Sequence, residues 1–307
     1  MLEEPKPTYQ KPFLSYEDQI ALLKNRGLFF ENEEQALKIL ERISYYRLSC
    51  YWYSFLEDKQ NKIFKKGASF DKVFEIYKFD MNLRKIIIAE IEKIEIAFRS
   101  KMAHILSLYK GSFWLEEDCL FSKLNKHKSL MIKIIDEIKR SDESLIVSFK
   151  KEYSNDIPPA FMVLEIMSFG ALSRLYRNLK SSKEKQEIAN FFGLLDKAFE
   201  SWLYSLVYVR NVCAHHARLW NRQMRIIPAH LETHKNQWLD NENVPNNRIY
   251  FILSMIIYLL NIINPQHSFK QKLNLLFSKC PDIDKAAMGF PADWQKEPLW
   301  NDINVSD

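Results

Sequence analysis

The feature that most constrains the fold is the stretch between Ser69 and Gly111, which contains no glycine and no proline. Apolar residues recur along it every three to four positions, as on one face of an α-helix. They are Ile76, Phe79, Leu83, Ile87, Ile91, Ile94 and Phe98. Ser69 is a suitable N-cap, and Gly111 is a suitable signal for the end of a helix. The pattern therefore predicts one long helix over residues 70–109.

The rest of the chain also indicates helices, because the whole sequence has only six glycines in 307 residues. Further helices are expected over residues 18–24, 33–55, 123–140, 145–151, 160–179, 183–192, 198–221, 247–264 and 268–280. Residues 228–245 should form a polar, irregular loop. The predicted fold is an all-α helical bundle in a single domain over residues 1–280, with an N-terminal helical extension. Residues 281–307 should form an extended C-terminal strap lying on that domain.

The composition narrows the class of protein. Hydrophobic residues make up 47% of the chain, which excludes wholesale disorder. The net charge of +5 permits an acidic partner without requiring one. The four cysteines lie far apart and form no Cys-x-x-Cys pair. We therefore expect neither a disulfide framework nor a structural zinc site, and we expect a reducing compartment.

No membrane segment and no secretion signal are expected. The longest apolar run, residues 249–263, is shorter than the roughly 20 residues needed to cross a bilayer, and it includes Ser254 and Asn261. The first residues, Met1 to Lys6, lack the layout of a signal peptide. These observations predict a cytoplasmic protein with no membrane partner, in which residues 249–263 form a buried helix.

The most chemically informative segment is residues 210–222, Arg-Asn-Val-Cys-Ala-His-His-Ala-Arg-Leu-Trp-Asn-Arg. It continues the apolar helix predicted over residues 198–221 and becomes polar within one turn. On a helix with about 3.6 residues per turn, four of its polar residues fall within a narrow stripe. These are Asn211, His215, Arg218 and Arg222. Arg210 borders the stripe, and its long side chain can reach over it.

Imidazole and guanidinium groups on one face suit chemistry on a phosphodiester. Metal-free RNA cleavage needs a base for the ribose 2′-hydroxyl, an acid for the leaving 5′-oxygen and a cation for the charged phosphorane. Imidazole titrates near neutral pH and can take either proton role, and arginine can hold two phosphate oxygens at once. We expect Arg210, Asn211 and His215 to form the catalytic site. Asn211 either hydrogen-bonds the His215 ring and fixes its tautomer or is a surface amide.

An arginine four to six residues before a histidine is a weak pattern by itself, and two other pairs share it. Arg99 and His104 lie in the long predicted helix, where Glu95 can pair with Arg99. Arg225 and His230 flank a proline, which argues against a helix there. The segment described above differs because it adds an asparagine, a second histidine and further arginines. The alternative is that its polar residues only cap a core helix.

The segment 210–222 resembles the Arg-x4–6-His motif of the HEPN nucleases. Its fuller form resembles, more narrowly, the Abi-type abortive-infection proteins of bacteria. The resemblance continues along nearly the whole chain in the same order. The matching elements are residues 11–19, 45–52, 77–80, 83–84, 95–99, 165–173 and 288–291 together with Trp294. One departure is Cys50, which stands where the family has glycine. This difference affects only local packing.

The resemblance implies a HEPN-like bundle that works as a metal-independent endoribonuclease, without a cofactor, in abortive infection or as a toxin-type antiphage effector. RNA is then the substrate, and a small RNA or an antitoxin protein is the implied inhibitor. HEPN relatives also imply a homodimer in which two copies of His215 face one cleft, one as base and one as acid. The alternative is a catalytically silent helical module of the same family that binds RNA or a protein.

Five further residues are candidates for support or for RNA binding: His216, Arg218, Arg222, Arg47 and Arg99. His216 either aligns the site or simply packs. Arg47 stands among the aromatic residues at positions 45–53, which form either a base-stacking platform or part of the core. Cys213 is predicted to be a small buried residue. The sequence has no glycine-rich phosphate loop, no His-Glu-x-x-His motif and no acidic cluster suited to two metals, which disfavours ATP-driven and metal-dependent hydrolysis.

Overall fold

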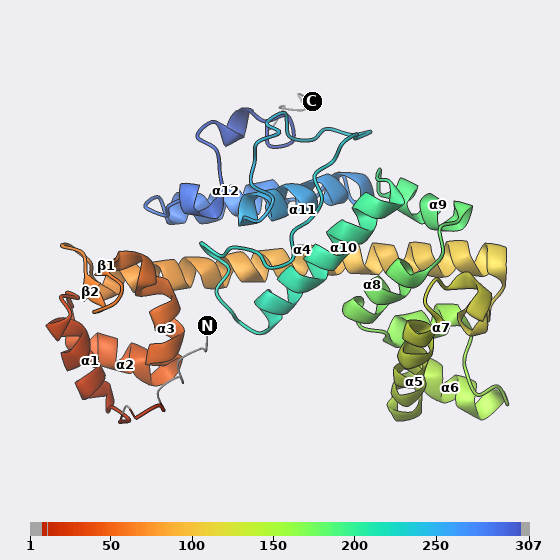
Figure 1. The fold of residues 1–307 in the computed structure, drawn as a ribbon, viewed down its shortest axis with the longest axis horizontal. Coiled ribbons are helices and arrows are strands. Elements are labelled where there is room, and N and C mark those ends of the chain that lie inside the picture. The colour runs from red at the N-terminus through yellow and green to blue at the C-terminus, as the bar shows by residue number, and fades with distance from the viewer. Residues whose placement is uncertain (1–7, 11, 302–307) are drawn as a thin grey trace, which may run out of the picture. The chain divides into compact units, whose positions relative to one another are not determined.

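The computed structural model describes residues 8–10 and 12–301, and the chain divides into two compact units, Met1–Met81 and Asn82–Asp307. In the described residues, twelve α-helices and short 3₁₀ turns account for nearly all the regular structure (Figure 1). The only sheet among them is a small hairpin of β1 (Leu56–Asp58) and β2 (Ile63–Phe64). The predicted helical fold is therefore confirmed. The prediction of one domain over residues 1–280 stays a prediction.

The first unit contains α1 (Tyr16–Asn25), α2 (Glu33–Ile43), α3 (Tyr45–Trp52) and the turn η1 (Tyr53–Phe55). The single helix predicted over residues 33–55 is wrong, because it is broken at Ser44. Ser44 has a φ of 68°, which ends α2, and its hydroxyl accepts a hydrogen bond from the Arg47 amide to begin α3. A serine at this position therefore acts as the N-cap of a new helix.

The long helix α4 (Phe70–Lys110) confirms the strongest sequence prediction. The Ser69 hydroxyl accepts a hydrogen bond from the Lys72 amide at 3.3 Å and caps its beginning. The helix ends directly before Gly111, which has a φ of 83°. Six of the seven predicted core positions are fully buried: Phe79, Leu83, Ile87, Ile91, Ile94 and Phe98. The seventh, Ile76, is half-buried.

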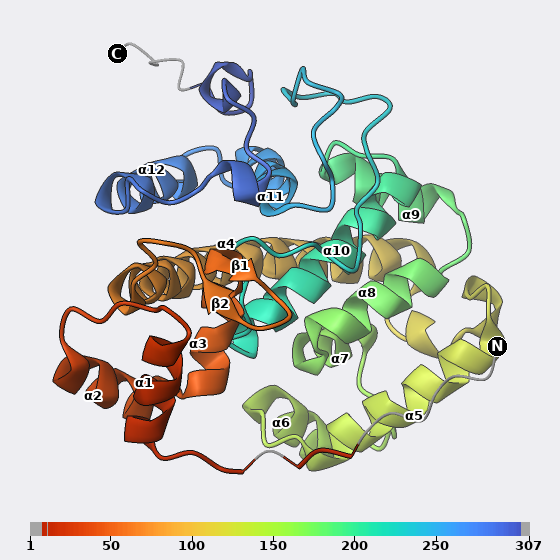
Figure 2. The ribbon, with the colours of Figure 1, turned by 60° about the vertical axis from the view of Figure 1, so that its left-hand side comes forward.

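The second unit continues from α4 with eight helices (Figures 1 and 2). They are α5 (Leu124–Arg140), α6 (Ser144–Glu152), α7 (Ala160–Ile166), α8 (Phe169–Asn178), α9 (Lys183–Phe191), α10 (Asp196–Ala214), α11 (Ile249–Ile263) and α12 (Phe269–Lys279). Short 3₁₀ turns lie at Trp114–Glu116, Asp118–Leu120, Ala286–Met288 and Trp294–Lys296. The single helix predicted over residues 160–179 is also wrong. Ser168 interrupts it, and its hydroxyl accepts from the Ala171 amide to begin α8.

An aromatic cluster joins α4, α8 and α10 within the second unit. The Phe98 ring makes edge contacts with Tyr176 at 5.5 Å and with Phe199 at 5.6 Å between ring centroids. Phe192 stacks on Phe199 at 4.5 Å. All four side chains are fully buried, so they fix the position of α10 on its neighbours.

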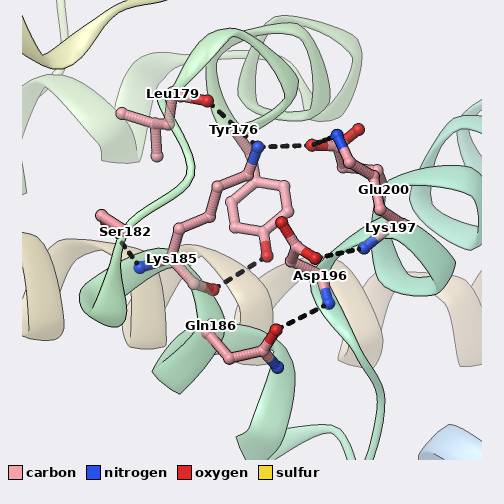
Figure 3. A network of polar contacts seen from close by, with 8 residues as sticks. All are labelled: Tyr176, Leu179, Ser182, Lys185, Gln186, Asp196, Lys197 and Glu200. Carbon is pink, nitrogen blue, oxygen red and sulfur yellow. Dashed lines mark hydrogen bonds and ion pairs between the residues drawn. The ribbon is translucent and has the colours of Figure 1, made fainter.

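A buried polar network holds the beginning of α10 to α8 and α9 (Figure 3). The Lys185 ammonium forms an ion pair with Glu200 and donates to the Leu179 carbonyl at 3.1 Å. The Tyr176 hydroxyl donates to the Lys185 carbonyl at 3.0 Å, and burial raises the pKa of that hydroxyl. Lys185 is only 2% exposed, so its charge depends on Glu200 for compensation.

Helix α11 is the buried helix that its apolar sequence predicts, with twelve buried residues from Ile249 to Leu260. No helix in the described part of the chain combines the length and the apolar character that a membrane crossing needs. Residues 281–301 contain only short 3₁₀ turns and pack through Phe290, Trp294 and Trp300. Trp300 donates to the Ser254 hydroxyl on α11 at 2.9 Å. The last part of the predicted strap, residues 302–307, lies outside the described residues.

Candidate functional site

The candidate site lies at the C-terminal end of α10, which ends at Ala214 rather than near residue 221. Two hydrogen bonds close this end: the His216 amide donates to Cys213 and the Ala217 amide donates to Val212, each at 3.0 Å. This pair of bonds defines a Schellman motif, with His216 at the left-handed position that usually holds glycine. His216 has a φ of 54°, so the backbone leaves the helix there.

The early end of α10 corrects the predicted stripe. Asn211 and His215 do share a face, but Arg218 and Arg222 lie beyond the helix. Arg222 still contacts α10, because its Nη1 donates a hydrogen bond to the Tyr208 hydroxyl at 3.1 Å. Its Nε also donates to the Arg218 carbonyl at 2.5 Å, which tightens the turn after the helix.

Two tyrosines that the sequence analysis did not single out share the face of Asn211 and His215. Tyr204 and Tyr208 precede them at intervals of four, three and four residues, which places all four on one side of α10. Tyr204 is 40% exposed. The helical spacing of the tyrosines was visible in the sequence, but the adjoining apolar positions made them look like part of the core.

Arg210, Asn211 and His215 are all exposed. The Arg210 guanidinium reaches the Asn211 amide oxygen at 3.5 Å, the upper limit of a hydrogen bond. Arg210 lies about 140° around the helix axis from His215, given about 3.6 residues per turn. In the part of the chain that the structure describes, no hydrogen bond or ion pair joins these two side chains. Asn211 therefore borders both groups, while the pair itself is not assembled within one chain.

The arginines around this helix end keep their charge unneutralised. Among residues 8–10 and 12–301, no ion pair involves Arg210, Arg218 or Arg222.

Cys213 is 4% exposed and is the small buried residue that the sequence predicts. His216 is exposed and shapes the end of the helix through its backbone.

The turn after α10 is held from the C-terminal side of the chain. Asn221 has a φ of 49°, and its side-chain oxygen accepts a hydrogen bond from Arg248 Nη1 at 3.2 Å. Gly289 packs against Arg248 so closely that a Cβ at this glycine would lie 2.5 Å from the Arg248 Cβ. Residues 281–301 therefore buttress the arginine that holds the last part of the 210–222 segment.

The Arg99–His104 pair has a different environment. Arg99 is 8% exposed and donates to the carbonyls of Leu164 and of Met167, the latter at 2.9 Å. It also pairs with Glu95 at 2.9 Å. Arg99 thus caps the C-terminal end of α7, whereas His104 is exposed. This placement is structural, and an RNA-binding role for Arg99 stays a prediction.

The remaining candidates belong to other parts of the chain than α10. Arg47 is exposed on α3 in the first unit, and its role stays a prediction. Of the aromatic residues around it, Tyr51 and Trp52 are buried, which favours the core interpretation for those two. Arg225 and His230 are exposed in an irregular loop, as the intervening proline indicates.

The fold and the site together define a helical protein with an exposed arginine, Arg210, and an exposed histidine, His215, at the C-terminal end of one helix. The sequence matches the family of Abi-like proteins over residues 38–221, more than half of the chain. The chain therefore belongs to the Abi-like protein family. The match ends at Asn221, so it includes nearly the whole 210–222 segment. No curated protein and no solved structure matches the chain.

Proposed function

We propose that this protein is a metal-independent endoribonuclease that acts in abortive infection, with Arg210 and His215 as its catalytic residues. The observation that carries the proposal is the placement of both side chains, exposed and without an ion-pair partner in the described residues, at the end of α10. If these two residues only capped a core helix, we would expect them to be buried and their charge to be compensated. Membership of the Abi-like family supports the biological role.

The proposed mechanism uses the groups at this helix end. A His215 imidazole takes the proton from the ribose 2′-hydroxyl, and a second imidazole protonates the departing 5′-oxygen. Arg210 stabilises the charge of the phosphorane through two-point contact with its oxygens. Asn211 orients the His215 ring. The products carry 2′,3′-cyclic phosphate and 5′-hydroxyl ends.

Two copies of the chain would supply the second imidazole. A single chain offers one Arg210 and one His215, and no contact within the described residues brings them together. A homodimer formed through the end of α10 places two copies of each in one cleft. Sedimentation of the active protein tests this requirement, since a strictly monomeric nuclease would contradict the composite site.

The absence of a contact between Arg210 and His215 within the described residues also favours a second candidate function, that of a binding module. If the pair is not assembled in a dimer either, the exposed cations form a catalytically silent surface that binds RNA or a protein. A nuclease would have to be held in check, which the resemblance assigns to an inhibitory RNA or an antitoxin protein. Expression without that inhibitor separates the two, because only a nuclease should slow host growth more than its His215→Ala variant at matched protein levels.

The decisive experiment is incubation of the purified protein with total RNA in the presence of EDTA. His215→Ala should lower cleavage by about 10²–10⁴, the usual value of general acid–base catalysis. Arg210→Ala should lower it by about 10²–10³, because it removes the group that stabilises the charged phosphorane. Arg210→Lys should not restore it fully, because an ammonium lacks the planar fork of a guanidinium. Asn211→Ala should be milder, since this residue only orients the ring.

The chain offers a matched control in Arg225 and His230, which have the same spacing and are also exposed. Arg225→Ala and His230→Ala should leave cleavage unchanged. If these variants lose activity and the variants at Arg210 and His215 keep it, the wrong pair has been assigned. If no RNA is cleaved by the wild type under any condition, the silent module is the better account.

A further inference from the structure

A cleft of about 740 Å³ lies between the first half of α5 and the C-terminal end of α8. Five of its ten lining residues are basic and none is acidic. The basic residues are Lys123, Lys126, Lys133, Arg174 and Arg177. The chain as a whole is nearly balanced, with 44 basic and 39 acidic residues, so this one-signed lining is a local concentration of charge.

The five cations are exposed, and none has an ion-pair partner among the residues that the structure describes. Their charge is therefore available to a ligand. The other end of α5 differs, because the hollow there is lined by Glu137, Glu143 and Glu165 together with Arg140. Only basic charges line the hollow at the first end of α5, whereas acidic residues predominate in the lining at the other end.

The walls of the cleft are held together before any ligand binds. The Asn178 side chain accepts from the Lys123 amide at 3.0 Å and donates to the Lys123 carbonyl at 3.1 Å. The Ser122 amide donates to the Asn178 carbonyl and the Lys180 amide donates to the Leu120 carbonyl, each at 2.8 Å. A ligand would therefore bind with little ordering of the protein backbone.

Helix α8, which forms one wall of the cleft, also packs against α10. Helix α8 lies between α5 and α10 in both views (Figures 1 and 2). The Arg177 guanidinium, which lines the cleft, lies over the Tyr204 ring at 4.7 Å from its centroid. Tyr204 shares a face of α10 with His215, eleven residues further on, which is about 16 Å along a helix axis.

We propose that this cleft binds the phosphate backbone of single-stranded RNA and directs the strand past Tyr204 to the end of α10. Lysine and arginine supply the backbone contacts, and an exposed ring supplies a surface for an unpaired base. A duplex keeps its bases stacked inside and would leave Tyr204 without that contact. An acidic protein is less suited, because its interface needs apolar anchors and the only apolar residue in the lining is Leu130.

The destination of the strand rests on the function proposed above, whereas binding in the cleft does not. The test therefore measures binding in a His215→Ala background, where cleavage does not interfere. The probe is a fluorescent single-stranded RNA of mixed sequence, titrated at several salt concentrations. The same RNA annealed to its complement and polyglutamate of equal charge are the competitors.

The decisive variant combines Lys126→Ala with Lys133→Ala. Its matched control combines Lys128→Ala with Lys139→Ala, which removes two exposed lysines from the same helix outside the cleft lining. The plot of log affinity against log salt has a negative slope. Loss of two phosphate contacts should make that slope less steep by about 1.4, at about 0.7 per single-strand contact. Affinity should fall about tenfold, as expected for two exposed ion pairs. The control should bind like its parent.

Equal losses in the two double variants would overturn the proposal, since the effect would then be general charge. Tighter binding of the duplex would overturn the choice of a single strand, and equal competition by polyglutamate would indicate an acidic protein instead. The two proposals fail separately. A wild type that binds RNA through the cleft but cleaves none refutes the nuclease alone. A nuclease whose binding and cleavage ignore Lys126 and Lys133 refutes the cleft alone.

Discussion

The end of α10 can be tested by comparing glycine with alanine at position 216. His216 has a φ of 54°, in the left-handed region where a residue with a Cβ is disfavoured by roughly 1–2 kcal/mol. Glycine removes that strain, but it raises the conformational entropy of the unfolded chain, which offsets about 0.4–1 kcal/mol. His216→Gly should therefore be more stable than His216→Ala by about 0.5–1 kcal/mol.

Alanine, rather than the native histidine, is the correct reference. Both variants lack the imidazole, so any contacts of the His216 side chain cancel in the comparison. The assay is urea unfolding followed by far-UV circular dichroism, with the free energies of unfolding compared at equal slopes. In thermal unfolding the same difference corresponds to about 1–4 °C for a unit of this size.

The sign of the difference distinguishes the structure from the sequence prediction. If the helix continued to residue 221, position 216 would be interior, and glycine would be less stable than alanine by about 1 kcal/mol. An alanine variant that equals or exceeds the glycine variant would refute the Schellman motif. It would also restore Arg218 and Arg222 to the predicted stripe.

Three further outcomes follow from buried groups. Glu200→Gln should lower the free energy of unfolding by about 3–5 kcal/mol in urea titrations, because it leaves the Lys185 ammonium buried without a counter-charge; replacing both by Met and Leu should cost less. Arg99→Ala should lower the free energy of unfolding by about 1–3 kcal/mol for each α7 carbonyl that it leaves unpaired. If Arg99→Ala weakens RNA binding but leaves this free energy unchanged, the structural role of Arg99 is contradicted. Burial lowers the pKa of His127 and of His267, so the unfolded chain binds more protons and the free energy of unfolding should fall as pH drops below about 6.5. In His127→Phe the urea midpoint should change less with pH across that range. If it changes with pH as much as in the wild type, His127 does not contribute.

The helices were predictable from sequence where a repeating apolar pattern and a cap coincide. The α4 helix has both, since Ser69 caps it and its buried face recurs without interruption to Phe98. The predicted helix over residues 33–55 failed because Ser44 can sit inside a helical pattern as easily as it can cap a new helix. Only its φ of 68° decides between them.

The candidate site was predictable in composition but not in geometry. Arg210, Asn211 and His215 are exposed as expected, because a polar segment after an apolar face seldom stays buried. The helix end was missed, since histidine at position 216 gives no glycine-like stop signal. The basic cleft was missed for another reason. Its lysines and arginines come from α5 and α8, about fifty positions apart, and only the folded chain brings them together.

The contact between Gly289 and Arg248 means that the family boundary at Asn221 is not the boundary of the functional unit. Arg248 holds Asn221, and both Arg248 and Gly289 lie beyond the matched residues. A premature stop codon or a protease cut near residue 280 would leave the whole matched region intact in sequence. The turn after His215 would nevertheless lose the wall behind its anchoring arginine. In a mutational survey such tail variants should resemble variants of Arg210 and His215, although both of these side chains are still present.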